Sequence, residues 1–183
     1  MEIIKLAPDN EKTIRQCAEL LHEAFSEHWP GAWPTVADAL EEVAECLAPD
    51  RILRVALNQA GDALGWIGGI PQYEDHVWEL HPLAVAAHAR GLGLGRRLVA
   101  DLEQQARARG GQTLWLGTDD ENQMTSLGGV DLYPNPLDHL RDIRNLRGHP
   151  YEFYQKLGFV ITGVMPDANG PGKPDIYMAK RIP

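Results

Sequence analysis

The spacing of hydrophobic residues predicts a chain in which helices alternate with short strands. Apolar residues recur every three or four positions from Ile14 to Phe25, from Val36 to Leu47 and from Leu94 to Ala106, the period of a helix with one buried face. Short helices are also expected at residues 137–146 and 149–158. Apolar runs bounded by turn-forming residues predict strands at residues 2–6, 52–57, 64–70, 76–85, 113–117, 159–164 and 176–180.

The lengths of the connections decide how these elements are arranged. The strands between residues 52 and 85 follow one another closely, so we expect them to be antiparallel neighbours. Thr35 and Asp38 form the pattern of a capping box at the start of the second helix. The expected fold is α/β (α+β), a mixed and mainly antiparallel sheet with helices on both faces, in one domain covering residues 1–183. The polar, aperiodic stretch at residues 118–136 is long enough to indicate a functional loop.

Composition narrows the range of partners. The chain has 183 residues, a hydrophobic fraction of 44% and a formal net charge of -9. This charge argues against nucleic acid as a partner and is compatible with a cationic substrate, although acidity for solubility alone is common. No stretch has the length and apolarity of a membrane span or a secretory leader, so no membrane is expected and cytoplasmic is the default location. Cys17 and Cys46 occupy apolar helical positions, which favours buried free thiols.

A glycine-rich turn stands directly before the helix that starts near residue 94. Its sequence is Arg90-Gly91-Leu92-Gly93-Leu94-Gly95-Arg96. Backbone amides of such a turn, together with the free amides and positive dipole end of a helix, can hold a pyrophosphate. A turn without any ligand is the plain alternative. A dinucleotide-binding turn is excluded by spacing, because its third glycine would fall on Arg96 or Leu98.

The strand before this turn carries two residues suited to proton chemistry. By strand alternation Glu79 and His81 share one face, and Pro82, which lacks an amide hydrogen, interrupts the ladder beside them. A surface pair of Glu79 with His81 is the plain alternative. A metal site is disfavoured, because this segment offers only two ligands.

Two motifs resemble those of the GNAT superfamily of acetyltransferases. The turn at residues 90–95 fits the pattern Arg/Gln-x-x-Gly-x-Gly/Ala, and residues 154–159 fit Tyr-x-x-x-Gly-Phe. Further segments resemble the aminoglycoside 6'-N-acetyltransferases of the chromosomal, dimer-forming type. The resemblance runs from about Ile3 to the end of the chain and is weakest at residues 31–48 and 121–130. The segments that carry it are residues 70–73, 78–83, 116–120, 149–154 and 173–176.

This resemblance implies direct acetyl transfer from acetyl-coenzyme A to an amine, without a metal and without a covalent enzyme intermediate. Glu79 is the candidate that accepts the amine proton or holds the cationic amine in place. His81 would orient Glu79 or the substrate, the Leu83 amide would bind the oxyanion and Tyr154 would assist the leaving thiolate. The expected coenzyme-binding residues are Leu83, Val85, Arg90, Gly91, Leu92, Gly93, Leu94, Gly95, Arg96 and Tyr154.

Acidic and aromatic side chains are expected to line the groove for a polycationic aminoglycoside. The candidates are Trp29, Tyr73, Glu79, His81, Asp119, Asp175 and Asp138, the last of which would reach a neighbouring subunit of a homodimer. Simpler roles remain open: Trp29 and Tyr154 as packed aromatics, and Asp119 and Asp120 as caps of a turn. Acetylation of another amine, such as a polyamine or a lysine, and a non-catalytic coenzyme A module are the competing functions.

Overall fold

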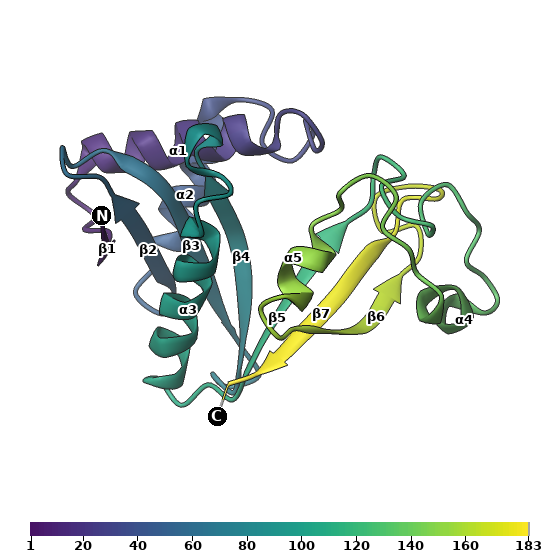
Figure 1. Ribbon diagram of the computed structural model, residues 1–183. Coiled ribbons are helices and arrows are strands. Elements are labelled where there is room, and N and C mark those ends of the chain that lie inside the picture. The colour runs from purple at the N-terminus through teal and green to yellow at the C-terminus, as the bar shows by residue number, and fades with distance from the viewer. Residues whose placement is uncertain (183) are drawn as a thin grey trace. The chain divides into compact units, whose positions relative to one another are not determined.

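The computed structural model describes residues 1–182 and divides into two compact units. The first unit comprises residues 1–114 together with Ile182, and the second comprises residues 115–181. Figure 1 shows the elements of both units. The expectation of a single domain stays a prediction.

The sheet of the first unit is antiparallel throughout. Its strands follow the order β1 (Glu2–Lys5), β2 (Ile52–Leu57), β3 (Ala63–Gln72) and β4 (Val77–Val85). The turn between β2 and β3 is organised by Asn58, whose side-chain oxygen accepts hydrogen bonds from the amides of Ala60 and Asp62. Strands joined by such short turns pair as neighbours, as the sequence predicted.

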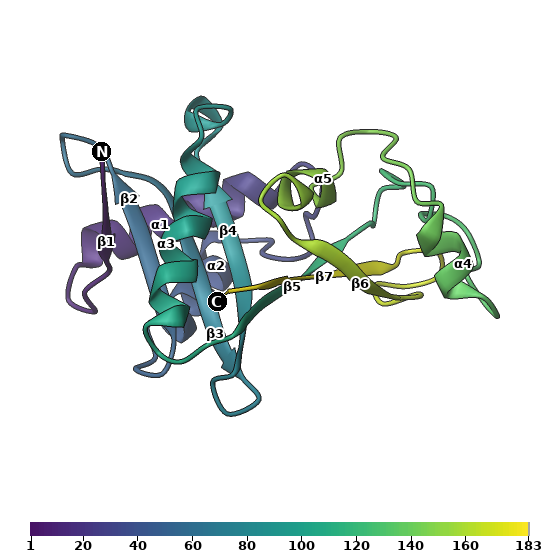
Figure 2. The ribbon, with the colours of Figure 1, turned by 60° about the horizontal axis from the view of Figure 1, so that its bottom comes forward.

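Helices cover both faces of this sheet, which confirms the predicted mixed, mainly antiparallel α/β fold. In Figure 2, α3 (Leu94–Arg107) lies over one face, and α1 (Glu11–Phe25) and α2 (Val36–Cys46) lie behind the other. The predicted capping box starts α2, because Thr35 and Asp38 each accept from the other's backbone amide. Cys17 and Cys46 are buried free thiols in the core beneath α1 and α2.

A bulge interrupts the pairing of β3 with β4. The register runs from Gly69 opposite Leu80 to Ile67 opposite Leu83, so β4 contains one extra residue there. Gly68 faces the bulge, and a Cβ at this position would collide with the carbonyl oxygen of His81. The predicted interruption at Pro82 is therefore present, and it depends on a glycine in the neighbouring strand.

The second unit combines three strands with two short helices and a long irregular loop. Its strands follow the order β5 (Thr113–Asp119, whose first two residues belong to the first unit), β7 (Asp175–Arg181) and β6 (Val160–Met165). The helices are α4 (Pro136–Arg141) and α5 (Tyr151–Gln155). No regular helix or strand occupies residues 120–135, in agreement with the predicted loop.

The predicted helix at residues 137–146 is wrong beyond Arg141. Ser126 donates its amide to the Arg144 carbonyl, and its hydroxyl oxygen accepts from the Arg144 amide. The amide of Leu146 donates to Met124 in the same way. These bonds to the 120–135 loop replace the helical ones. Within residues 1–182, no helix combines the length and the apolarity that crossing a membrane requires.

Candidate functional site

The glycine-rich turn at residues 90–96 has the predicted shape of an anion-binding turn. Gly91 and Gly93 adopt φ values of +75° and +79°, in the left-handed region that favours glycine. Gly93 is the N-cap of α3, and the first backbone bond inside the helix runs from the Arg97 amide to the Gly93 carbonyl. The amides of Leu94, Gly95 and Arg96 precede that bond, so no turn of the same helix accepts from them.

The space beside the two left-handed glycines of this turn is open. A Cβ at Gly91 or Gly93 would meet no atom within 4 Å. Arg90 and Arg96 are exposed, and Leu92 has an exposed fraction of 78%, whereas Leu94 points into the core. Leu83 and Val85, also predicted to bind the coenzyme, are half-buried on β4. The turn therefore offers free amides and positive charge to an anion such as a pyrophosphate.

Glu79 lies half-buried on the same face of β4 as His81, as predicted. Its Oε2 accepts a hydrogen bond of 3.1 Å from the side-chain amide of Gln72 on β3. The carboxylate is thus held in place by a neutral donor and keeps its negative charge available to a cation.

His81 has a different partner from the one the sequence suggested. Its Nε2 lies 3.7 Å from Oε2 of Glu42, a residue of α2, and Glu79 makes no ion pair with His81 within the described residues. The interpretation of these two residues as a surface pair is therefore wrong. Glu79 contributes only a longer-range charge interaction, which acts with the contact to Glu42 to raise the pKa of His81 despite burial.

Aromatic rings lie beside the imidazole of His81. The ring of Trp33 lies 5.8 Å from the imidazole of His81 and 4.8 Å from the ring of Phe25. Trp29 also contacts Phe25, at 5.6 Å between ring centroids. The predicted residue Trp29 therefore belongs to an aromatic cluster whose member nearest to His81 is Trp33.

The pKa of Glu42 is held below its usual value. Burial alone would raise this pKa, but a contact with His81 and its positive charge, together with hydrogen bonds from Cys46 and Trp33, lower it. The Cys46 thiol donates to Oε1 of Glu42 at 3.5 Å, and burial raises its own pKa to about 12. At neutral pH the thiol is therefore a neutral donor to a charged carboxylate.

The second unit presents a separate face of acidic and aromatic side chains. Asp175 on β7 lies against Gly117 of β5, where a Cβ would collide with the carboxylate. Asp119 shares the side of β5 on which Gly117 lies, since it is two residues further along the strand. Trp115 and Tyr177 continue this side, with ring centroids 5.8 Å apart. We call these five residues the β5–β7 face.

Asp120, the neighbour of Asp119, caps a turn as the alternative interpretation allowed. Its carboxylate is fully buried and accepts from the amides of Met124 and Thr125 at 2.6 and 2.9 Å and from the Thr125 hydroxyl at 2.7 Å. Asp119 has different contacts, because its side chain accepts from Asn169 and its carbonyl lies 3.1 Å from Nε2 of His149.

Tyr154 lies on α5, near the C-terminal end of that short helix. Its ring contacts Phe153 and Phe159 at centroid distances of 5.1 and 5.7 Å. Desolvation raises the pKa of the phenol far above its ordinary value of 10.0, so the hydroxyl stays protonated and able to donate at neutral pH.

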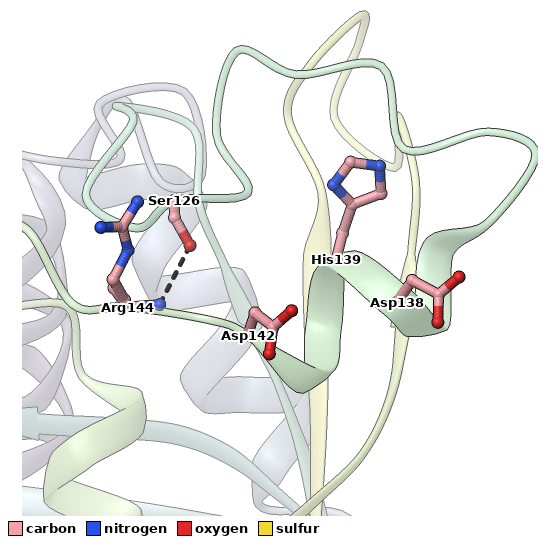
Figure 3. Close-up of a pocket in the computed structure, with 5 residues that line it drawn as sticks. All are labelled: Ser126, Asp138, His139, Asp142 and Arg144. Atoms are coloured by element: carbon pink, nitrogen blue, oxygen red, sulfur yellow. Dashed lines mark hydrogen bonds between the residues drawn. The ribbon is translucent and has the colours of Figure 1, made fainter.

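Two predicted substrate residues are strongly exposed. Tyr73 occupies the turn between β3 and β4 with φ +49° and an exposed fraction of 78%. Asp138 is paired with Arg141 at 3.1 Å on α4. It borders a cavity of about 340 Å³ whose lining Figure 3 shows, namely Ser126, Asp138, His139, Asp142 and Arg144. In residues 1–182 no group of three His, Cys, Asp or Glu side chains is arranged to hold a metal ion.

Sequence reasoning missed Glu42, Trp33 and Gln72 as site residues. Each contacts a predicted residue from another element. Gln72 lies in one of the segments that resemble the family, whereas Glu42 and Trp33 belong to no motif. Trp115 and Tyr177 were missed for the same reason, although alternation along a strand that ends in Asp119 would have found Trp115.

Comparison with known proteins identifies related chains. The family model described as "Acetyltransferase (GNAT) family" matches residues 14–127. A crystal structure of aminoglycoside 6'-N-acetyltransferase complexed with coenzyme A is 44% identical, with a TM-score of 0.90 over 100% of this chain and 98% of that one. No curated protein matched.

Two further structures have similar names. The aminoglycoside 6'-N-acetyltransferase from Enterococcus faecium is 44% identical, with a TM-score of 0.88 over 100% of this chain and 98% of that chain. An aminoglycoside 6'-acetyltransferase type Ii is 39% identical over the same shares, with a TM-score of 0.75.

Proposed function

Because the chain belongs to the GNAT family of acetyltransferases, we propose that it transfers acetyl from acetyl-coenzyme A to the 6'-amine of aminoglycosides. The observation that carries this proposal is the 44% identity, over the whole chain, to two solved 6'-N-acetyltransferases. One of those two is complexed with coenzyme A, and the turn at residues 90–96 has the free amides and open space that a pyrophosphate requires.

The residues of the turn at 90–96 hold the coenzyme in this proposal. Backbone amides of residues 91–96 bind the pyrophosphate, and the side chains of Arg90 and Arg96 add positive charge. Leu83 and Val85 on β4 would also hold the coenzyme. When bound, acetyl-coenzyme A supplies an acyl group activated as a thioester.

The side chains of β4 act on the acceptor amine. The amine arrives as an ammonium group, and a carboxylate attracts it and accepts its proton directly or through water. Glu79 is that carboxylate, since Gln72 fixes it without neutralising it. The amide of Leu83, which follows the bulge in β4, donates to the carbonyl oxygen as negative charge develops there.

Tyr154 protonates the leaving sulfur, so that the thioester becomes a thiol. The nitrogen loses two protons as the ammonium group becomes an amide: one is released through Glu79 to solvent, and the other restores the phenol of Tyr154. Support comes from its raised pKa and from the fit of residues 154–159 to the family signature. In this proposal the β5–β7 face binds further ammonium groups and sugar rings of the substrate, and Trp29 and Tyr73 keep the substrate-binding role expected from the sequence. This mixture of carboxylates and aromatic rings suits a polycation.

The cellular setting follows from this activity. We assign the enzyme to the cytoplasm, where it would confer antibiotic resistance, and to a homodimer in which Asp138 approaches the partner. Light scattering of the purified chain tests the dimer. To test resistance, cells expressing the chain and cells expressing Glu79→Gln are grown with and without aminoglycoside, and their growth is compared.

The decisive experiment measures thiol release from acetyl-coenzyme A with two aminoglycosides that differ only at the 6' position. Rapid release with the 6'-amine and none with the 6'-hydroxyl supports both the reaction and its site. Release with both members contradicts the regiochemistry. No release with either contradicts the proposed substrate, and polyamines and peptides are then assayed as acceptors.

A further inference from the structure

The imidazole of His81 meets a second carboxylate that takes no part in the reaction described above. Glu42 reaches it from α2, with 3.7 Å between Oε2 and Nε2. This distance is that of an ion pair and exceeds a hydrogen bond. The side chain of Glu42 is 16% exposed, against 39% for His81. Glu42 is therefore the inner member of the pair, and His81 is the member that can face a ligand.

The other carboxylate oxygen of Glu42 is also held by a contact. Its Oε1 accepts from the Cys46 thiol, one helical turn later on α2, and Cys46 belongs to the hydrophobic core. The Cys46 sulfur also lies 3.9 Å from the carbonyl oxygen of His81. Because the ring of Trp33 lies 5.8 Å from the imidazole, His81 is located by an anchored carboxylate and by an aromatic ring.

We propose that Glu42 is a positioning residue of the acetyl transfer, which holds His81 through Nε2 and sets the charge that the imidazole presents to the acceptor amine. This inference rests on the proposed function. It assigns to α2, in the segment where the resemblance to the family is weakest, an acidic residue that acts through another side chain.

The consequence is a defined pH dependence. Burial and three charged groups act on the pKa of His81: Glu42 from α2, Glu79 from its own strand and Arg51 from the segment before β2. The two carboxylates raise the pKa of His81, while burial and Arg51 lower it, and the net direction is upward. An imidazolium repels a cationic amine beside it, so the neutral ring is the productive form. Activity should therefore fall as the pH drops through the pKa of His81.

The first test follows the His81 titration by NMR in the wild type, Glu42→Gln and Glu41→Gln. Glutamine keeps the shape of the side chain and removes its charge, so the His81 pKa should fall in Glu42→Gln. Glu41→Gln is the matched control, because it removes the same charge from the adjacent, exposed position of α2. His81→Asn assigns the resonance. An unchanged His81 pKa in Glu42→Gln, or an equal fall in Glu41→Gln, overturns the proposal.

The second test compares the pH profiles of kcat/KM with the same aminoglycoside. Ionisation of the amine contributes equally to every variant, so the difference between profiles reports His81. In Glu42→Gln the loss of activity should move to lower pH, and Glu41→Gln should follow the wild type. Glu42→Ala should lower kcat by about tenfold to a hundredfold through misplacement of the ring, with the KM for the coenzyme unchanged. Glu42→Gln should retain most of the kcat that Glu42→Ala loses.

The two tests separate this inference from the proposed function. If the wild type acetylates no aminoglycoside, the proposed function fails, while the NMR titration still decides whether Glu42 sets the charge of His81. If the titration shifts as expected but the kinetic profiles of Glu42→Gln and the wild type coincide, the pair exists without a part in transfer, and the positioning role is wrong. Thermal melting of each variant confirms that it is folded.

Discussion

Two adjacent aspartates at the end of β5 have different surroundings and should have separable effects. Asp120 is buried and accepts three hydrogen bonds from Met124 and Thr125, whereas Asp119 lies on the β5–β7 face. Asp120→Asn replaces one carboxylate oxygen by an NH2 group. That group is itself a donor and cannot accept from the amides of Met124 and Thr125 or from the Thr125 hydroxyl. Chemical denaturation should show a free energy of unfolding lower by about 2–3 kcal/mol, the value of a hydrogen bond to a buried charge.

Asp119→Asn is the matched variant for that measurement. It should change the free energy of unfolding by less than about 1 kcal/mol and raise the KM for the aminoglycoside, since it removes one charge from the proposed substrate face. Equal stability losses in both variants would show that Asp119 is structural as well.

At the same scale, His149 should make the second unit sensitive to acid. Its Nδ1 accepts from the Tyr151 amide at 3.2 Å, and its Nε2 lies 3.1 Å from the Asp119 carbonyl, so both contacts need the neutral ring with hydrogen on Nε2. Burial lowers the pKa of His149 in the folded state below its ordinary value of 6.5. The stabilisation is therefore present above pH 6.5 and is lost as the pH falls through the folded pKa.

Thermal melting at several pH values checks this expectation. His149→Gln should melt below the wild type at pH 8, because it cannot make both contacts, and should lose less additional stability between pH 8 and pH 5. His139→Gln, at an exposed histidine of the same unit, should follow the wild type throughout. The idea fails if His149→Gln and the wild type lose stability in parallel.

At the scale of elements, the two ends of α3 carry glycines with the same conformation and different proposed roles. Gly93 at the start and Gly110 after the end have φ values of +79° and +88°, and a Cβ would meet no atom within 4 Å at either. Alanine should therefore cost about 1–2 kcal/mol of folding free energy at each position, from backbone conformation alone. By calorimetry, only Gly93→Ala should also weaken coenzyme binding, by about tenfold or 1.4 kcal/mol. Equal coenzyme affinity in both variants would place the anion site elsewhere.

Elements whose determinants lie close together in sequence could be predicted from sequence alone. The capping box of α2 needs only Thr35 and Asp38, and the left-handed turn needs only the glycines at residues 91 and 93. The contact of Glu42 with His81 depends on how α2 packs on the sheet, and no local pattern contains that information. The early end of α4 has the same origin, because Ser126, a distant residue, supplies the bonds that replace the helix. The sequence thus predicts which elements form, but it does not predict which side chains from different elements contact one another.

At the scale of the whole molecule, the formal net charge of -9 bears on how the substrate arrives. A polycationic aminoglycoside is attracted over distances comparable to the Debye length, which is about 10 Å at 0.1 M salt and about 3 Å at 1 M. The local carboxylates, Glu42 and Glu79 in the first unit and Asp119 and Asp175 in the second, add to this field at short range. The net negative charge of the chain is therefore expected to affect how fast a polycationic substrate binds.

Raising the salt concentration from 0.05 M to 0.5 M should lower kcat/KM for a tetra-amine aminoglycoside mainly through KM, with little change in kcat. The reason is that screening weakens the encounter and the outer ammonium contacts, while the amine that the proposal places next to the half-buried Glu79 is partly shielded from ions. A small monoamine acceptor is the control, and its kcat/KM should change less because it carries a single charge. A fall in kcat with a constant KM would instead place the effect of salt on the transfer step, and equal slopes for both acceptors would show that the net charge has no part in capturing the substrate.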